Sequence, residues 1–111
     1  VSAIGRHMFY RAGFYTAKLP STLMEIGVAA FEENSDLENV SFNVGLKRIG
    51  AEAFWGCSRL KSVELPEGLE EIGKYAFHGT AIEEVHIPKT VKKLHPNAFD
   101  KSTKVIYLAE D

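Results

Sequence analysis

The dipeptide Ile-Gly recurs along this 111-residue chain at a nearly constant interval, and this repeat constrains the fold more than any other feature. Its isoleucines are residues 4, 26, 49 and 72, with Leu94-His95 in the fifth place, so the steps are 22, 23, 23 and 22 residues. A column of phenylalanines follows five residues behind, at Phe9, Phe31, Phe54, Phe77 and Phe99. A period of this length predicts a solenoid, in which each repeat is one small structural unit stacked on the next.

The third repeat, Ile49–Pro66, shows the local structure that we expect of every repeat. In its second half Val63 and Leu65 have the alternating spacing of a half-buried strand. Pro66 then ends the strand, because its nitrogen donates no hydrogen bond. The aligned segments predict a narrow parallel sheet of stacked strands, with Lys104–Leu108 as the last one.

The segment after each Ile-Gly pair is predicted to be one helical or 3-10 turn. Lys74–Phe77 has the length of such a turn. His95-Pro96 agrees with this prediction, because proline suits the first position of a helix. The expected fold class is therefore an α/β repeat solenoid, with short parallel strands on one side and helical or 3-10 turns opposite.

The repeats fill the chain and predict a single domain, residues 1–111, of about five units that start near residues 1, 23, 46, 69 and 91. The leucine column before each strand reads Phe14, Leu37, Leu60 and Ile82. Val1 precedes Ile4 with the repeat's own spacing, so the chain begins within the repeat, and an uncapped end of a solenoid exposes core residues. We therefore expect Val1 and Ile4 to face solvent, and the chain to be a fragment of a longer array or to self-associate end to end.

Composition excludes two classes of partner. The chain has 13 Lys and Arg against 15 Asp and Glu, whereas nucleic-acid binding needs a concentrated basic surface. No apolar run approaches the roughly 20 residues that span a bilayer, so no membrane insertion is expected of this segment. The single cysteine, Cys57, excludes an internal disulfide.

The full pattern L-x-x-I-G-x-x-A-F-x-x-C-x-x-L-x-x-V-x-L-P, complete in Leu46–Pro66, resembles the BspA-type (Treponema pallidum-type) leucine-rich repeat. The resemblance spans essentially the whole chain. Met8, Asn43 and His95 depart from it, where the family has alanine, proline and glycine, and these departures concern local turn geometry.

The resemblance implies a leucine-rich-repeat horseshoe whose parallel sheet lies on the concave side. It also implies a cell-surface or secreted protein with a role in adhesion, which binds a host or matrix protein. The family that the chain resembles has no catalytic residues to carry over, so no enzyme activity and no cofactor are expected.

Cys57 belongs to a column of mostly small residues three places after each phenylalanine; its other members are Ala12, Asn34, Thr80 and Ser102. A small polar side chain at this place can bond turn backbone that the sheet leaves unpaired. A structural role is therefore favoured over a nucleophile, which needs a neighbouring base. A reactive surface thiol is the minor alternative.

The four histidines, His7, His78, His86 and His95, fall in different columns, so no metal site is predicted. The one conceivable cluster is His86 with Glu64 and Glu84, and a solvated sheet face is the favoured interpretation of these three residues. An enzyme would need a ligand or ion bound at this cluster.

The best candidates for function are the side chains that flank the buried column of each strand, because alternate strand residues point out of a sheet. These partner-binding candidates on the expected concave face are Thr16, Lys18, Asn39, Ser41, Lys61, Ser62, Glu64, Glu84 and His86. Trp55 is an edge candidate, since tryptophan is enriched at binding hot spots. Its alternative role is packing on the backbone of its own repeat.

The sequence thus predicts a non-catalytic protein-interaction module. Extended surfaces of this kind are what solenoids use to bind partners. The alternative is a structural spacer repeat with no ligand of its own, in which the same face is merely solvated.

Overall fold

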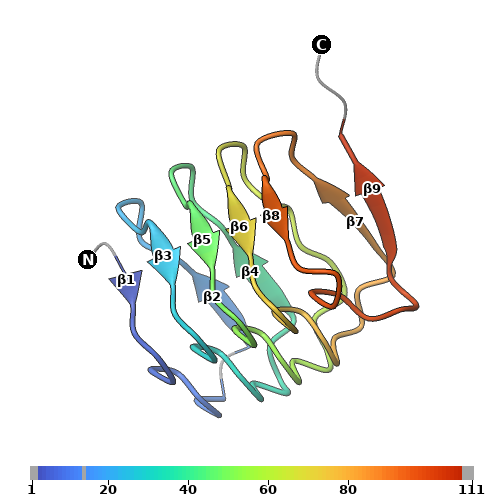
Figure 1. Cartoon of the computed structure of the whole chain (residues 1–111). Helices are drawn as coiled ribbons and strands as arrows, with labels where there is room; N and C mark the ends of the chain where they lie inside the picture. The colour runs from blue at the N-terminus through green and yellow to red at the C-terminus, as the bar shows by residue number, and fades with distance from the viewer. Residues whose placement is uncertain (1–2, 14, 109–111) are drawn as a thin grey trace.

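The computed structural model describes residues 3–13 and 15–108, so the predictions for Val1 and Phe14 lie outside the described residues. The described residues form a solenoid of parallel strands (Figure 1). Its coils stack side by side from the N-terminal to the C-terminal end, with one layer of strands in front, a second behind and connecting turns along both edges. The parallel solenoid that the sequence predicted is therefore present.

The longest sheet runs through the Ile-Gly positions and has the order β1-β3-β5-β6-β8. Each strand has two residues; they are β1 (Ala3–Ile4), β3 (Glu25–Ile26), β5 (Arg48–Ile49), β6 (Glu71–Ile72) and β8 (Lys93–Leu94). Equivalent residues are paired, so Ile26 lies beside Ile49 and Ile49 beside Ile72. We call this layer the short-strand sheet. The sequence pattern did not predict strands here.

The layer in which the sheet was predicted is interrupted. Strands β2 (Thr16–Lys18) and β4 (Asn39–Ser41) form one pair, and β7 (Glu84–Ile87) and β9 (Lys104–Tyr107) form another. We call these four strands with residues 61–65 the long-strand face. The final strand was predicted correctly, but the prediction of a strand at 61–65 was wrong. No backbone group there is hydrogen-bonded to another described residue, so the ladder that defines a strand is missing.

The prediction of helical or 3-10 turns was wrong as well, because residues 3–13 and 15–108 contain no helix. Ala29, Glu52 and Tyr75 have φ of 57–59°, a left-handed conformation that no right-handed helix can include. The backbone N–H groups beside them point to the next coil; Phe54 N donates to Ala76 O at 2.7 Å. A helix would use these donors within one segment. The turns instead form a ladder from coil to coil.

The fifth repeat departs at His95-Pro96 without becoming helical. The backbone N–H of Asn97 donates to Nδ1 of His95 at 3.0 Å, and that of Ala98 donates to the carbonyl of His95 at 3.0 Å. These two bonds close a turn. The proline is thus accommodated in a turn and does not start a helix.

Close approach of the coils explains the glycine column. A Cβ on Gly50 would lie 2.8 Å from the carbonyl carbon of Gly27 and from the nitrogen of Val28, both in the preceding coil. Gly73 meets the coil before it in the same way, with a virtual contact of 2.6 Å to Ala51 N. A side chain at either position would therefore force the neighbouring coils to shift.

The core lies between the two layers and is organised in columns. Phe31, Phe54 and Phe77 are stacked with ring centroids 5.1–5.2 Å apart and nearly parallel planes. The three rings are almost fully buried. Leu23, Leu46 and Leu69, which lie three residues before Ile26, Ile49 and Ile72, are fully buried too.

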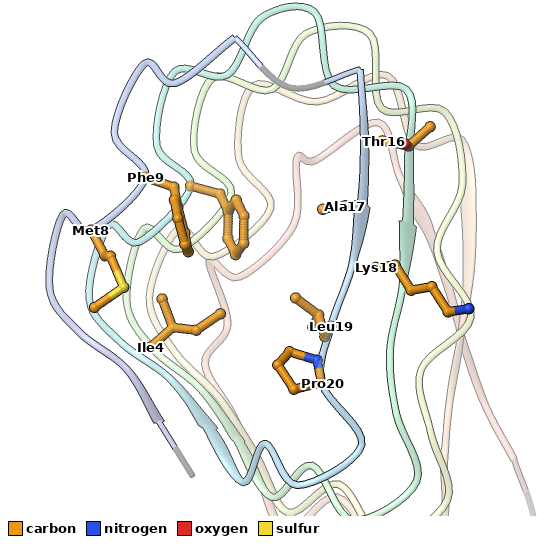
Figure 2. Close-up of a pocket in the computed structure, with 9 residues that line it drawn as sticks. Ile4, Met8, Phe9, Thr16, Ala17, Lys18, Leu19 and Pro20 are labelled. Atoms are coloured by element: carbon orange, nitrogen blue, oxygen red, sulfur yellow. The ribbon is translucent and has the colours of Figure 1, made fainter. Parts of the chain in front are cut away.

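The first coil holds an apolar hollow, and the position of Ile4 in it differs from the prediction. Ile4 was predicted to face solvent, and this prediction was wrong, because its side chain is only 5% exposed. It points into the coil between Met8, Phe9 and Leu19 (Figure 2). These residues line an apolar hollow of about 380 Å³, and the half-buried core residues there are Phe9 and Ala17.

Candidate functional site

All nine residues proposed from the sequence as a binding face have exposed side chains. The residues between them are turned inward: Val40 and Val63 are half-buried, and Val85 is buried. Alternation along the strand therefore places the polar side chains outside. Exposure of these residues is observed; their role in binding stays a prediction.

The structure brings most of these residues together around the segment 61–65. A hollow of about 440 Å³ separates this segment from β4; Asn39, Ser41, Ser62 and Glu64 lie on it, with Phe42, Val63 and Leu65 as apolar lining. A second hollow of about 440 Å³ lies on the other side of the segment and is lined by Glu64, Glu84 and His86 with Leu108. Lys61 belongs to a third, of about 550 Å³. The irregular segment is thus the centre of the candidate site.

Two of the nine residues do not join this group. Thr16 and Lys18 lie in β2, where they line the apolar hollow of the first coil instead (Figure 2). Lys18 is paired in register with Ser41. The first coil therefore flanks the candidate site rather than forming part of it.

Sequence reasoning missed the residues that the last strand contributes. Lys104 is paired with Glu84 and Ile106 with His86, so both extend the face beyond β7. The fifth repeat has lost the usual spacing after its phenylalanine, which is why these residues could not be aligned. The signal that remained was the β-rich run at Val105, Ile106 and Tyr107.

The cluster of His86 with two glutamates is only partly formed. Nε2 of His86 lies 2.9 Å from Oε2 of Glu84, and both side chains are exposed. Among the described residues, no group of three His, Cys, Asp or Glu side chains is arranged to hold a metal ion. What the arrangement provides is a polar, mixed-charge surface.

Cys57 has the structural role that the sequence favoured. Its side chain is fully buried, and Sγ donates to the carbonyl of Phe31 at 3.3 Å. Burial raises the pKa of the Cys57 thiol to about 12, so the thiolate that a nucleophile needs is absent at neutral pH. Asn34 acts in the same way, since its amide donates to the carbonyls of Phe9 and Phe31.

The fifth member of this column, Ser102, does not have the role of Cys57 and Asn34, because its side chain is exposed. The neighbouring Thr103 is buried, and its hydroxyl donates to the carbonyl of Ile82 at 2.7 Å. Thr103 directly precedes Lys104, which pairs with Glu84, so it lies at the start of β9 and outside the column of Cys57.

Trp55 lies apart from the long-strand face, in the turn ladder. It is half-buried and lines a hollow of about 590 Å³ together with Arg11, Glu33 and Asp36. Its backbone carbonyl accepts a hydrogen bond from Glu33 N at 2.7 Å. In a separate respect, the described residues form no helix that is long and apolar enough to cross a membrane.

Comparison with solved structures places the fold among leucine-rich-repeat proteins. A leucine-rich repeat protein from Bacteroides ovatus is 38% identical over 97% of this chain and 29% of that chain, with a TM-score of 0.88. The Treponema pallidum leucine-rich repeat protein is 28% identical over 88% of this chain and 47% of its own, with a TM-score of 0.85. This chain therefore spans less than half the length of either protein.

A third similar structure is a leucine rich cell surface protein from Faecalibacterium prausnitzii, 24% identical over 99% of this chain and 44% of that chain, with a TM-score of 0.54. A search among curated proteins finds no match.

The sequence profile of the BspA type leucine rich repeat region matches residues 1–106 in six copies. This match confirms the resemblance that Leu46–Pro66 indicated. The chain belongs to the BspA-type leucine-rich repeat family.

Proposed function

We propose that this chain is a non-catalytic protein-interaction module whose long-strand face binds a protein partner. Membership in a leucine-rich repeat family supports the general role, because these repeats commonly serve as interaction modules. The observation that carries the proposal is the pair of hollows on either side of residues 61–65, which are lined by half-buried Val63 and Leu65 together with exposed polar side chains. Protein interfaces combine apolar and polar groups in a similar way.

The charges on this face suggest how a partner is selected. Glu64 and Glu84 line one hollow, and Lys104 lies in register with Glu84 at the far strand. Charged groups at the rim of an interface contribute more to orientation and association rate than to affinity. A partner with basic groups opposite Glu64 and Glu84 fits this pattern.

A surface or secreted location is part of the proposal. It is supported by the resemblance stated above and by the related cell surface protein of Faecalibacterium prausnitzii. A host or matrix protein is accordingly the class of partner that we propose to test first.

Charge reversal tests the binding face. We expect Glu64→Lys and Glu84→Lys to weaken binding to purified extracellular-matrix proteins about tenfold each, while the free energy of unfolding changes by less than about 1 kcal/mol. Surface plasmon resonance with a panel of such proteins measures the first effect, and chemical denaturation the second. Glu67→Lys is the matched control, because Glu67 is exposed and lines none of the hollows of this face. Equal binding by all three variants would refute the assignment of the face.

The spacer alternative is favoured by one observation, the continuous ladder of backbone bonds that ties each turn to the next coil. If the chain only separates neighbouring domains, deletion of one whole repeat leaves function intact apart from a shorter reach. Loss of a specific ligand in such a deletion rejects this alternative.

A further inference from the structure

The hollow at Trp55 has features that the long-strand face lacks. Three coils contribute to it: Arg11 from the first, Glu33, Ser35 and Asp36 from the second, and Trp55 from the third. The turn ladder joins these coils, since Arg11 N donates to Glu32 O at 3.1 Å and Glu33 N to Trp55 O at 2.7 Å. The lining residues are therefore held on a rigid scaffold, as a binding site requires.

Two of these residues have hydrogen-bonding groups without a partner. Among the described residues, the indole N–H of Trp55 and the hydroxyl of Ser35 make no hydrogen bond. Trp55 is half-buried and Ser35 is exposed, and neither polar group is among the buried side-chain atoms of the described residues that lack a partner, so both are accessible to a ligand. The hollow thus offers a donor, a hydroxyl and an aromatic ring to a ligand.

The charges that line the hollow are balanced within the protein. Nη2 of Arg11 lies 2.6 Å from Oε1 of Glu33, and Nε of Arg11 donates to the same oxygen at 2.8 Å. Asp36 has Arg59 as its neighbour, at 3.9 Å. Since each carboxylate has its own guanidinium, neither an anion nor a cation gains a strong net attraction here.

We propose that this hollow binds a neutral sugar ring of a glycan. A pyranose has an apolar C–H face that packs on an indole ring and a rim of hydroxyls that donate and accept hydrogen bonds. The carboxylates accept from those hydroxyls, while Arg11 and the indole N–H donate to them. Because each hydrogen bond to the protein replaces one to water and so contributes little net free energy, a single sugar binds with a dissociation constant on the order of 1 mM.

Fluorescence of Trp55 tests this site directly, because it is the only tryptophan of the chain. The whole chain is titrated with glucose, galactose, mannose and N-acetylglucosamine, with glycerol as a control for unspecific polyol effects. We expect a saturable change with at least one sugar and none with glycerol. Calorimetry on Trp55→Ala, which is checked for folding by circular dichroism, is expected to show no binding of that sugar.

Two variants of Asp36 test whether the ligand needs a hydrogen-bond acceptor at this position, as a sugar does, or a negative charge, as a basic peptide does. For a sugar, Asp36→Ala is expected to weaken binding roughly tenfold, as a lost bond to a charged group does, whereas Asp36→Asn keeps an acceptor and weakens it less. Glu67→Ala, outside the hollow, is expected to bind like the wild type.

Two results would overturn the sugar proposal. One is the lack of a saturable change with all four sugars; the other is saturation by a tetralysine peptide but by no sugar. Neither result bears on the long-strand face, whose charge-reversal variants lie outside this hollow.

Discussion

At the scale of single residues, the glycine after each isoleucine sets how closely two coils approach. The virtual Cβ of Gly50 lies 2.8 Å from backbone of the preceding coil, and backbone cannot move aside as a flexible side chain would. At Gly5, in the first coil, the nearest atom is the Cε of Met8 at 3.5 Å, an ordinary contact. An added Cβ is thus accommodated at Gly5 but collides with backbone at Gly50.

We predict that Gly50→Ala lowers the free energy of unfolding by about 1–3 kcal/mol, as overpacking does. Gly5→Ala is the control and is expected to change it by less than about 0.5 kcal/mol. Urea denaturation followed by circular dichroism measures both values. Equal losses in the two variants would show that helix or strand propensity, rather than close approach, decides the effect.

Truncation of a buried phenylalanine is predicted to lower the free energy of unfolding more than the glycine substitutions do. Phe54 is fully buried and stacked on Phe31 and Phe77, with Phe42 edge-on at 5.8 Å. Phe54→Ala is expected to cost about 3–5 kcal/mol, the usual range for a buried aromatic ring. Phe42→Ala, at a half-buried position, is expected to cost clearly less. A loss below about 1 kcal/mol for Phe54→Ala in the same denaturation assay would contradict its place in the core.

At the scale of elements, the third coil is joined to its neighbours by backbone hydrogen bonds on some sides and not at residues 61–65. Gly50 N donates to Ile26 O at 2.7 Å in the short-strand sheet, and Phe54 N donates to Ala76 O at 2.7 Å in the turn ladder. No backbone N–H of residues 61–65 donates to a described residue. Local opening is easiest where such bonds are few.

Hydrogen exchange therefore has a predicted pattern within one coil. We expect the amides of Lys61, Val63 and Glu64 to exchange at least about tenfold faster than those of Gly50 and Phe54, because the latter must break a bond first. Residue-resolved NMR exchange gives both sets in one experiment. Similar protection on the two sides would mean that residues 61–65 are bonded in solution.

The elements also show what could be predicted from the sequence. Stacking, core columns and outward side chains followed from periodicity, because each depends on where apolar residues recur. The turns did not, since positive φ at Ala29, Glu52 and Tyr75 leaves no mark in residue type, unlike a glycine. Two-residue strands such as Arg48–Ile49 are too short to show alternation. The hollow at Trp55 needs contacts between three coils, which no single repeat displays.

At the scale of the whole molecule, the two layers differ in surface charge. On the short-strand sheet, charges alternate along the solenoid axis: Arg48 lies 3.0 Å from Glu25 and 3.7 Å from Glu71, and Lys93 lies 3.9 Å from Glu71. Exposed ion pairs of this kind contribute about 0–1 kcal/mol each. The charges of this sheet are thus paired with one another, whereas on the long-strand face Glu84 is paired with His86, and Lys61 and Glu64 have no ion pair among the described residues.

The apolar hollow of the first coil leads to a prediction about the assembly of this chain. Its apolar hollow, lined by Ile4, Met8, Phe9 and Leu19, is the place where we propose that a second copy docks end to end. Sedimentation velocity of this chain is expected to show a concentration-dependent dimer, and Met8→Glu, at a position 57% exposed, is expected to remain monomeric. A monomer at all concentrations for the wild-type chain refutes end-to-end association.

The missing bonds at residues 61–65 also give the stack a mechanical character. Backbone bonds hold the second, third and fourth coils together along the short-strand sheet and along the turn ladder. On the remaining side these three coils have no such ties between residues 61 and 65. The solenoid is therefore expected to resist separation of the coils at the short-strand sheet and at the turn ladder more than at residues 61–65. Bending that separates the coils at residues 61–65 therefore breaks no backbone hydrogen bond of those residues.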